Sequence, residues 1–145
     1  MRIIGGNFKG KKIAFVKSKS TRPLRDFVKE NIFNILNHSN IIDFNIKSAK
    51  VLDLYSGVGS FGIECISRGA QKTTFVESDN KALIILKKNI EQLKIEKKAN
   101  IFSTKIGVFL NQLSKDDKFE IIFMDPPFSE DSFIKELKII KNLNI

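Results

Sequence analysis

The sequence predicts an α/β protein with a doubly wound, mostly parallel β-sheet. Three observations predict this class: short apolar stretches alternate with stretches of helical spacing, the connections between them are short, and a glycine-rich turn follows the apolar stretch at residues 51–55. An apolar run this short is typical of a strand that is buried on both faces, as in a parallel sheet. Alternation of such strands with helices places helices on both faces of the sheet.

The length and composition of the chain restrict its class further. The 145 residues are enough for one domain with a substantial core, and 42% hydrophobic with 28% charged residues is typical of a soluble globular protein. Cys65 and His38 are the only residues of their kinds, so an internal disulfide and a multi-ligand His/Cys metal centre are excluded, and we expect no metal. No apolar run is long enough to cross a bilayer and no secretory leader follows Met1, so we expect a cytoplasmic monomer without a membrane partner.

The positive charge is concentrated in the N-terminal segment. Residues 1–25 contain eight Lys and Arg residues and no acid, whereas the other 120 residues contain 17 cations and 16 acids. Such asymmetry indicates contact with a nucleic acid, although a solvated basic arm also explains it. We predict a basic β-hairpin and linker at residues 1–24, followed by the main domain at residues 25–145. The candidate nucleic-acid contacts are Lys9, Lys11, Lys12, Arg22 and Arg25. Phe8 either stacks on a base or packs beneath the hairpin.

The glycine-rich turn is predicted to bind a nucleotide or nucleoside. Gly57, Gly59 and Gly62 follow the first strand and precede a helix that ends near residue 68. Glycine adopts positive φ and has no Cβ, so this turn can lie against a ligand while free N–H groups of the helix face it. Asp53 lies inside the strand, where its carboxylate needs partners such as loop N–H groups or the ammonium group of a ligand. A glycine turn without a ligand is the alternative.

The remaining elements follow from periodicity and from capping residues. We predict, in chain order, a helix at 25–36, a strand at 73–77, a helix from 79 to about 93, a strand at 100–103, a helix at 107–113 and a strand at 119–124. Ser78 or Asp79 can cap the helix that follows the second strand. That strand ends in Glu77, and an acid in this place can accept both hydroxyls of a ribose.

The fourth strand leads directly into Asp125-Pro126-Pro127-Phe128. Because ligands of an open α/β sheet bind beyond the carboxyl ends of its strands, Asp125 should emerge beside the glycine turn. The two prolines form a rigid turn with free carbonyls, so the segment can hold an exocyclic amine by its hydrogens while the aromatic ring stacks on the base. We therefore predict these four residues as catalytic, by positioning and electrostatics. A strand-ending Asp-Pro turn is the alternative.

With both loops in view, the chain resembles the class I S-adenosylmethionine-dependent methyltransferases, which have a Rossmann-like sheet. It is most similar to the RsmD family, which methylates guanine N2 of 16S ribosomal RNA in the small subunit. The resemblance rests on residues 1–6, 21–23, 33–36, 51–57, 67–70, 75–77 and 125–128 taken together. It implies that S-adenosylmethionine is the co-substrate and that 16S ribosomal RNA is the partner, gripped by the hairpin and Arg22. The donor-binding residues that it implies are Asp53, Tyr55, Ser56, Gly57, Gly59, Glu77, Ser78 and Thr104.

The chain departs from the family pattern in three places. The family usually has an acid after the third strand, near the adenine of the donor, whereas residues 102–105 here read Phe-Ser-Thr-Lys. Phe128 replaces a more usual tyrosine, which keeps a stacking ring and loses a hydroxyl. The family sheet has seven strands, whereas four or five are predicted here, so we expect the C-terminal strands to be missing and one sheet edge to be uncovered.

Three other functions fit part of the pattern. A DNA methyltransferase acting on adenine N6 or cytosine N4 would use the same Asp-Pro-Pro-aromatic segment. A nicotinamide-dependent oxidoreductase would use the glycines and Glu77, but it would leave residues 125–128 unexplained and has no evident acid for hydride transfer. A non-catalytic module that binds ribosomal RNA would keep the fold without turnover.

Overall fold

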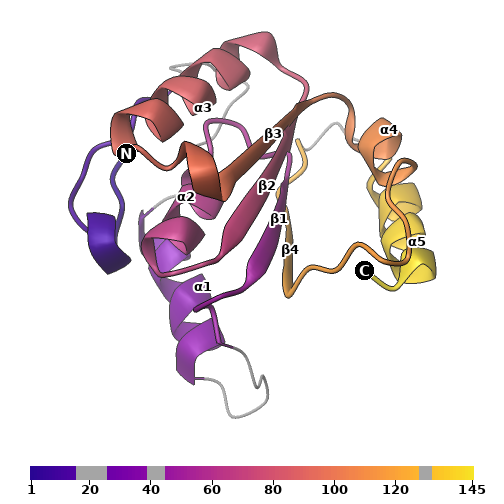
Figure 1. Ribbon diagram of the computed structural model, residues 1–145, viewed down its shortest axis with the longest axis horizontal. Coiled ribbons are helices and arrows are strands. Elements are labelled where there is room, and N and C mark those ends of the chain that lie inside the picture. Colours follow the sequence, from indigo (N-terminus) through magenta and orange to yellow (C-terminus); the bar gives the residue numbers. More distant parts are fainter. Residues whose placement is uncertain (16–25, 39–44, 128–131) are drawn as a thin grey trace.

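Among the described residues, the sheet has four parallel strands, within the four or five that the sequence predicts. The computed structural model describes residues 1–15, 26–38, 45–127 and 132–145. Its strands are β1 (Lys50–Leu54), β2 (Lys72–Glu77), β3 (Ala99–Ser103) and β4 (Ile121–Met124), and they lie in the order β3-β2-β1-β4 (Figure 1). The chain moves outward from β1 to β3 and then returns to the other side of β1. The strand order therefore reverses between β1 and β4, the place where α/β sheets of this kind bind ligands.

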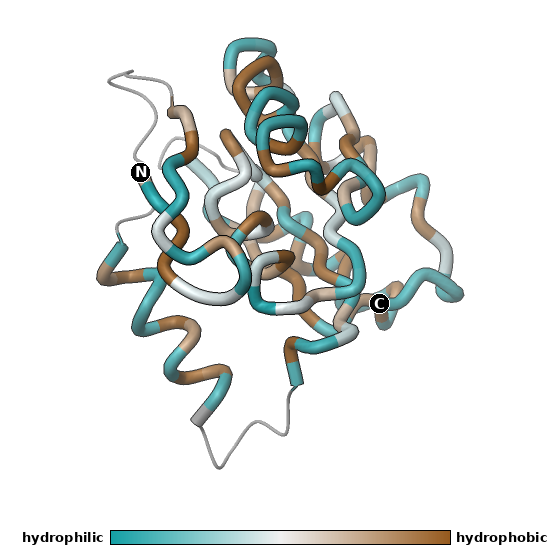
Figure 2. Tube along the Cα trace, turned by 60° about the vertical axis from the view of Figure 1, so that its left-hand side comes forward, coloured by the Kyte–Doolittle hydropathy of each residue, from teal (hydrophilic) through white to brown (hydrophobic). Residues whose placement is uncertain are grey.

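In the described part of the chain, α-helices cover both faces of the sheet (Figure 1). The helices α1 (Asp26–His38), α2 (Ser60–Ser67) and α3 (Asn80–Leu93) lie on one face, and α4 (Ile106–Leu110) and α5 (Phe133–Leu143) lie on the other. Side chains of β1 alternate between these layers, since Val51 packs with α1 and α2 while Leu52 and Leu54 pack with α4 and α5. The doubly wound prediction is thus confirmed. In Figure 2 hydrophobic and hydrophilic residues follow each other along the coil of α3, as expected of a helix with one buried face.

The boundaries of the predicted helices and of the four strands of the sheet match to within a few residues, whereas α5 was not predicted from the sequence. The largest difference in boundaries has a local cause. The helix predicted at 107–113 ends at Leu110, because the next N–H groups bond three residues back, Gln112 to Phe109 and Leu113 to Leu110. Asp79 rather than Ser78 caps α3, and its carboxylate accepts a hydrogen bond from the Ala82 N–H.

The N-terminal arm (residues 1–15) reverses direction but does not form two regular strands. Arg2 and Lys12 form an isolated antiparallel bridge, and the short 3-10 helix η1 (Gly6–Phe8) occupies the turn. Backbone groups that a β-ladder would use bind α2 instead: Glu64 accepts from the N–H groups of residues 4 and 5, and Ser67 Oγ accepts from that of Phe8. Competition from α2 therefore replaces the predicted strands with a chain reversal.

Two isoleucines bury the arm against the main domain. Ile3 and Ile13 are almost fully buried and pack with α2, α3 and β2 in one core cluster. Phe8 packs against the same cluster and carries the Lys11 ammonium 5.0 Å above its ring centre, so of its two predicted positions the structure shows packing beneath the hairpin. The basic arm is thus fixed to the domain through side chains of the core.

At its other edge the sheet ends in β4. All four residues of β4 are half-buried, and among the described residues this strand pairs only with β1. Its position is secured by a stack of three rings, in which Phe61 of α2 lies between Phe33 of α1 and Phe123 of β4. Among the described residues, no helix is both long and apolar enough to cross a membrane.

Candidate active site

The carboxyl ends of the strands bring the predicted site residues to one edge of the sheet. Leu54 of β1 pairs in register with the penultimate residue of β2 and with the last residue of β4. Tyr55, Glu77 and Asp125 therefore emerge at the same level, and Glu77 is in turn paired with Ser103 of β3. The prediction that Asp125 lies beside the glycine turn is confirmed at the level of the strands. Three acids, Asp53 included, meet at the reversal of strand order.

The glycine turn has one packed side and one open side. Gly57 and Gly59 have φ values of 56° and 86°, in the left-handed region that favours glycine. A Cβ on Gly59 would lie 2.5 Å from Leu86 Cδ1, whereas a Cβ on Gly57 would meet no atom within 4 Å. The turn is therefore pressed against α3 at Gly59 and faces open space at Gly57. This open side is where a ligand can approach the backbone.

Asp53 lies under the turn and holds the start of α2. Its Oδ2 accepts a hydrogen bond of 2.9 Å from the Gly62 N–H, and a Cβ on Gly62 would lie only 2.4 Å from the Phe75 ring. The close approach of α2 to the sheet thus needs glycine at this position. The loop N–H was one of the two partners that the sequence predicts for Asp53.

Burial and neighbouring charge make Asp53 a weak acid. The side chain is 1% exposed, and burial raises the pKa of Asp53 from 3.8 to about 7, against the opposing effect of the Gly62 hydrogen bond. The negative charges of Asp125 and Glu77 contribute to this increase. A site that concentrates three carboxylates in this way is electrostatically suited to a cationic ligand.

Glu77 organises the backbone around the turn. Its Oε2 accepts from the Gly57 N–H at 2.7 Å, and its Oε1 accepts from the N–H groups of Ser78 and Asp79 at 2.8 Å each. The Thr104 N–H donates to the Glu77 carbonyl at 3.1 Å. Three of about four acceptor positions on the carboxylate are thus used by backbone amides, and about one stays available for a hydroxyl. Ser78 and Thr104 are therefore both held next to Glu77 by hydrogen bonds of their backbone N–H groups.

Two serine hydroxyls in the turn lack partners. Ser56 and Ser60 are nearly buried, and neither Oγ has a hydrogen-bond partner among the described residues. Buried hydroxyls are normally satisfied, so these two mark positions where polar atoms of a ligand can bind. Ser56 was predicted from the sequence, whereas Ser60, the first residue of α2, was not. Its position on the helix side of the glycines gave no separate sequence signal.

Tyr55 connects the turn to α5. Its backbone is left-handed, with φ 57°, and its hydroxyl donates to Glu136 Oε2 at 2.7 Å. Glu136 is 4% exposed and its Oε1 accepts from the Ser132 hydroxyl at 3.0 Å. The phenol therefore connects the end of β1 with the first turn of α5. Sequence analysis assigned Tyr55 to the donor and missed Glu136, which follows the Asp-Pro-Pro segment by about ten residues.

The Asp-Pro-Pro segment leaves the sheet beside these groups. Asp125 and Pro127 are exposed and Pro126 is half-buried. Although Asp125 is exposed, neighbouring protein atoms desolvate its carboxyl and raise its pKa above the ordinary value. Phe128 lies outside the described residues. In the parts of the chain that are described, no group of three or more His, Cys, Asp or Glu residues could hold a metal ion.

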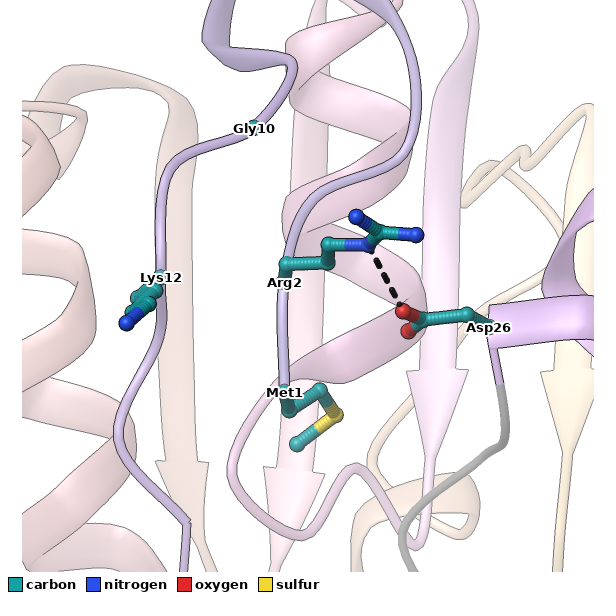
Figure 3. Close-up of a pocket in the computed structure, with 5 residues that line it drawn as sticks. All are labelled: Met1, Arg2, Gly10, Lys12 and Asp26. Carbon is teal, nitrogen blue, oxygen red and sulfur yellow. Dashed lines mark hydrogen bonds and ion pairs between the residues drawn. The ribbon is translucent and has the colours of Figure 1, made fainter.

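The predicted nucleic-acid contacts lie on the arm, at a different part of the surface. Lys9, Lys11 and Lys12, the arm lysines, are all exposed, while Arg22 and Arg25 lie outside the described residues. An open pocket of about 310 Å³ lies between the arm and α1, lined by Met1, Arg2, Gly10, Lys12 and Asp26 (Figure 3). Figure 3 shows the Arg2 guanidinium turned to Asp26, with Nε 3.0 Å from Oδ2. No strand end or residue of the glycine turn lines this pocket.

Comparisons with known proteins agree with this architecture. Residues 1–145 match a family model described as "Conserved hypothetical protein 95". The YlbH protein of Bacillus subtilis (strain 168) is 36% identical over 141 residues, or 97% of this chain and 73% of YlbH. "Ribosomal RNA small subunit methyltransferase D" of Haemophilus influenzae is 37% identical over 129 residues, or 88% of this chain and 64% of that relative. The solved structure of yhhF from Escherichia coli superposes with a TM-score of 0.81 at 30% identity, covering 98% of this chain and 72% of yhhF.

Proposed function

We propose a function from the family of this chain, which belongs to the conserved hypothetical protein 95 family, the RsmD family of methyltransferases. The chain transfers a methyl group from S-adenosylmethionine to the exocyclic N2 of a guanine in 16S ribosomal RNA of the small subunit. The relative from Haemophilus influenzae, named a ribosomal RNA small subunit methyltransferase, supports the substrate class. The observation that carries the proposal is the meeting of Asp53, Glu77 and Asp125 beside a glycine turn with two unpartnered serine hydroxyls. The chain spans between 64% and 73% of the length of the two relatives described above.

The residues around the turn fit this donor. When bound, S-adenosylmethionine supplies an electrophilic methyl group on a positively charged sulfonium. Glu77 offers about one free acceptor position for a ribose hydroxyl, and Ser56 and Ser60 offer hydroxyls for the polar groups of the methionine part. The open side of Gly57 lets the donor lie against the backbone. Ser78 and Thr104, whose N–H groups bind Glu77, would contact the rest of the nucleoside.

Charge supports the same assignment. Asp125 and Glu77 both raise the pKa of Asp53, so their mutual repulsion is largest when all three carboxylates are ionised. A cationic ligand relieves this repulsion and favours the ionised form of Asp53. Asp53 thus contributes to donor binding through charge, while its hydrogen bond to Gly62 keeps the start of α2 in place.

Asp125 and the two prolines would act on the guanine. The lone pair of a nucleobase amine is delocalised into the ring, so acceptors that hold its hydrogens make the nitrogen a better nucleophile. The Asp125 carboxylate and the carbonyls of Pro126 and Pro127 would supply these acceptors, and Phe128 would stack on the base. The amine nitrogen would form a bond to the methyl carbon as the carbon–sulfur bond of the donor breaks and S-adenosylhomocysteine leaves, and the nitrogen would then release one N–H proton. The raised pKa of Asp125 makes its carboxylate a stronger base for that proton.

The arm would hold the RNA. The three arm lysines are exposed and are free to neutralise phosphates, with Arg22 and Arg25 proposed beside them from the sequence. The proposal assigns no base stacking to Phe8, since its ring packs on the core beneath Lys11. The arm would therefore supply affinity and orientation, whereas the specificity for guanine would come from the strand ends.

Asp125→Asn tests the proposal. We expect this variant to bind adenosylmethionine with unchanged affinity, by calorimetry, and to transfer no labelled methyl group to 16S ribosomal RNA, because asparagine cannot take the proton. Asp116→Asn, in an exposed turn of the connection between α4 and β4, is the matched control and should keep full activity. Transfer by Asp125→Asn at the wild-type rate would remove Asp125 from the mechanism. Donor binding without any transfer by the wild-type chain would favour a non-catalytic binding module.

A further inference from the structure

One polar side chain in the core contacts both the arm and the glycine turn. Asn89 lies on the inner face of α3 and is fully buried, between apolar residues of the same face such as Leu86 and Ile90. A carboxamide in this position is costly unless its hydrogen bonds are made. The proposed chemistry gives Asn89 no role. The presence of a buried carboxamide at residue 89 is therefore explained by the groups to which it is hydrogen-bonded.

Three hydrogen bonds of Asn89 join segments that are far apart in the sequence. Asn89 Oδ1 accepts from the Ala14 N–H at 2.8 Å, and Nδ2 donates to the Ala14 carbonyl at 3.0 Å. The second Nδ2 hydrogen goes to the Val58 carbonyl, also at 3.0 Å. Both donors of the carboxamide are thus used, one on the arm and one on the turn.

The pair of bonds to Ala14 fixes the direction of the third bond. Two bonds to one residue determine both the plane of the carboxamide and which end carries the nitrogen. The remaining N–H then has a single direction, toward Val58. If the arm leaves α3, Asn89 loses two of its three bonds and its amide is free to rotate. The orientation of the Val58 carbonyl therefore depends on where residue 14 lies.

Val58 occupies the centre of the turn proposed to hold the donor. It lies between Gly57 and Gly59, both with positive φ, and the neighbouring N–H groups are fixed by Glu77 and by the Ser56 carbonyl. Asn89 draws the Val58 carbonyl toward α3, on the packed side of the turn. This contact helps to keep the other side, at Gly57, open for a ligand.

We propose that Asn89 is a positioning residue that couples the seating of the N-terminal arm to the donor-binding conformation of the glycine turn. This inference rests on the proposed function, which assigns RNA to the arm and adenosylmethionine to the turn. Contacts of RNA with the arm lysines then favour the conformation of Ala14 that orders Val58, and donor binding favours the same conformation. Because coupling between two binding sites is reciprocal, RNA and donor raise each other's affinity.

Calorimetric titration with adenosylmethionine tests the coupling in three variants. Asn89→Ala removes all three bonds, and we expect donor affinity to fall about tenfold, within the usual range of coupling between sites. Ala14→Pro removes the N–H that donates to Asn89 and restrains the backbone of the arm at residues 13 and 14, but it changes no residue of the turn. A fall in donor affinity in this variant therefore shows transmission from the arm. Ser67→Ala is the matched control, because it removes two hydrogen bonds of the arm, at Gly5 and Phe8, and leaves the bonds between Ala14 and Asn89 in place. Its donor affinity should stay within about twofold of wild type.

A second titration measures the reciprocal effect. Adding 16S ribosomal RNA should tighten donor binding in the wild-type chain and in Ser67→Ala, and should have no effect in Asn89→Ala. If Asn89→Ala does not fold, Ala14→Pro carries the test alone. Wild-type donor affinity in both Asn89→Ala and Ala14→Pro would overturn the inference and leave the proposed function intact. Absence of donor binding in the wild-type chain would refute both.

Discussion

The substitution Asp53→Asn shows how the buried charge of Asp53 affects the stability of the fold and, separately, the affinity for the donor. Asparagine has the shape of aspartate, and its Oδ1 can still accept the hydrogen bond that the Gly62 N–H donates to Asp53. It cannot ionise, so it removes the charge that burial, Asp125 and Glu77 make unfavourable. The variant should therefore be more stable than wild type wherever Asp53 is ionised in the unfolded chain.

The pKa change gives the size and the pH range of this effect. Folding raises the pKa of Asp53 from 3.8 to about 7, and each unit corresponds to about 1.4 kcal/mol. Below pH 4 the group is protonated in both states and costs nothing. Between pH 4 and 7 the folded state keeps a proton that the unfolded state loses, so stability falls as the pH rises. Above pH 7 the full cost of about 4 kcal/mol is present.

Urea unfolding at pH 5 and pH 8 measures this cost. The stability advantage of Asp53→Asn over wild type should grow by about 2–3 kcal/mol between the two pH values, since most of the titration lies between them. Asp116→Asn, an exposed control, should show no such growth. An advantage that does not change with pH would refute the raised pKa. Donor affinity should fall in the same variant, because the charge that destabilises the fold is the one that a cationic donor needs.

Three further predictions concern the turn, the contact with α5 and the arm. Gly59→Ala should lower the free energy of unfolding by about 2–4 kcal/mol, because it adds left-handed backbone strain and a clash with Leu86. Gly57→Ala should lower it by about 1–2 kcal/mol, because it adds the backbone strain alone. Equal losses for the two variants in urea unfolding would contradict a packed side at Gly59 and an open side at Gly57. Tyr55→Phe should cost about 1–3 kcal/mol because buried Glu136 loses a donor, and unchanged thermal unfolding would show that this contact is not formed. Replacing the three arm lysines by alanine should reduce the slope of log RNA affinity against log salt by about 2–3, and an unaltered slope would make the arm a solvated segment.

The strands of the sheet and the helices from α1 to α4 could be predicted because each has a local signal, whereas α5 was not predicted from the sequence. The strands are short apolar runs, α3 has apolar residues at helical spacing with Asp79 as its cap, and Gly57 and Gly59 mark a turn with positive φ. Once the strands are parallel, their carboxyl ends share an edge, which places Glu77 and Asp125 together without further information.

The contacts that complete the site could not be predicted in this way. Tyr55 and Glu136 are 81 residues apart, and Ala14 and Asn89 are 75 apart. A buried Glu or Asn has the same sequence appearance as one on a solvated helix face, so only the packing reveals its partner. The arm does not form the two predicted strands for the same reason, since the N–H groups of residues 4 and 5 donate to Glu64 on α2. Local propensity determines the elements, and long-range polar contacts determine how the loops between them are held.

Methyl transfer from labelled adenosylmethionine to undermethylated small ribosomal subunits tests the central claim most directly. Naked 16S ribosomal RNA and double-stranded DNA serve as competing substrates, and the labelled nucleoside is identified by mass spectrometry after digestion. The proposed function predicts N2-methylguanosine in 16S ribosomal RNA from the wild-type chain, none from Asp125→Asn, and no label in DNA. Label on adenine N6 or cytosine N4 of DNA, with none on guanine in RNA, would contradict it.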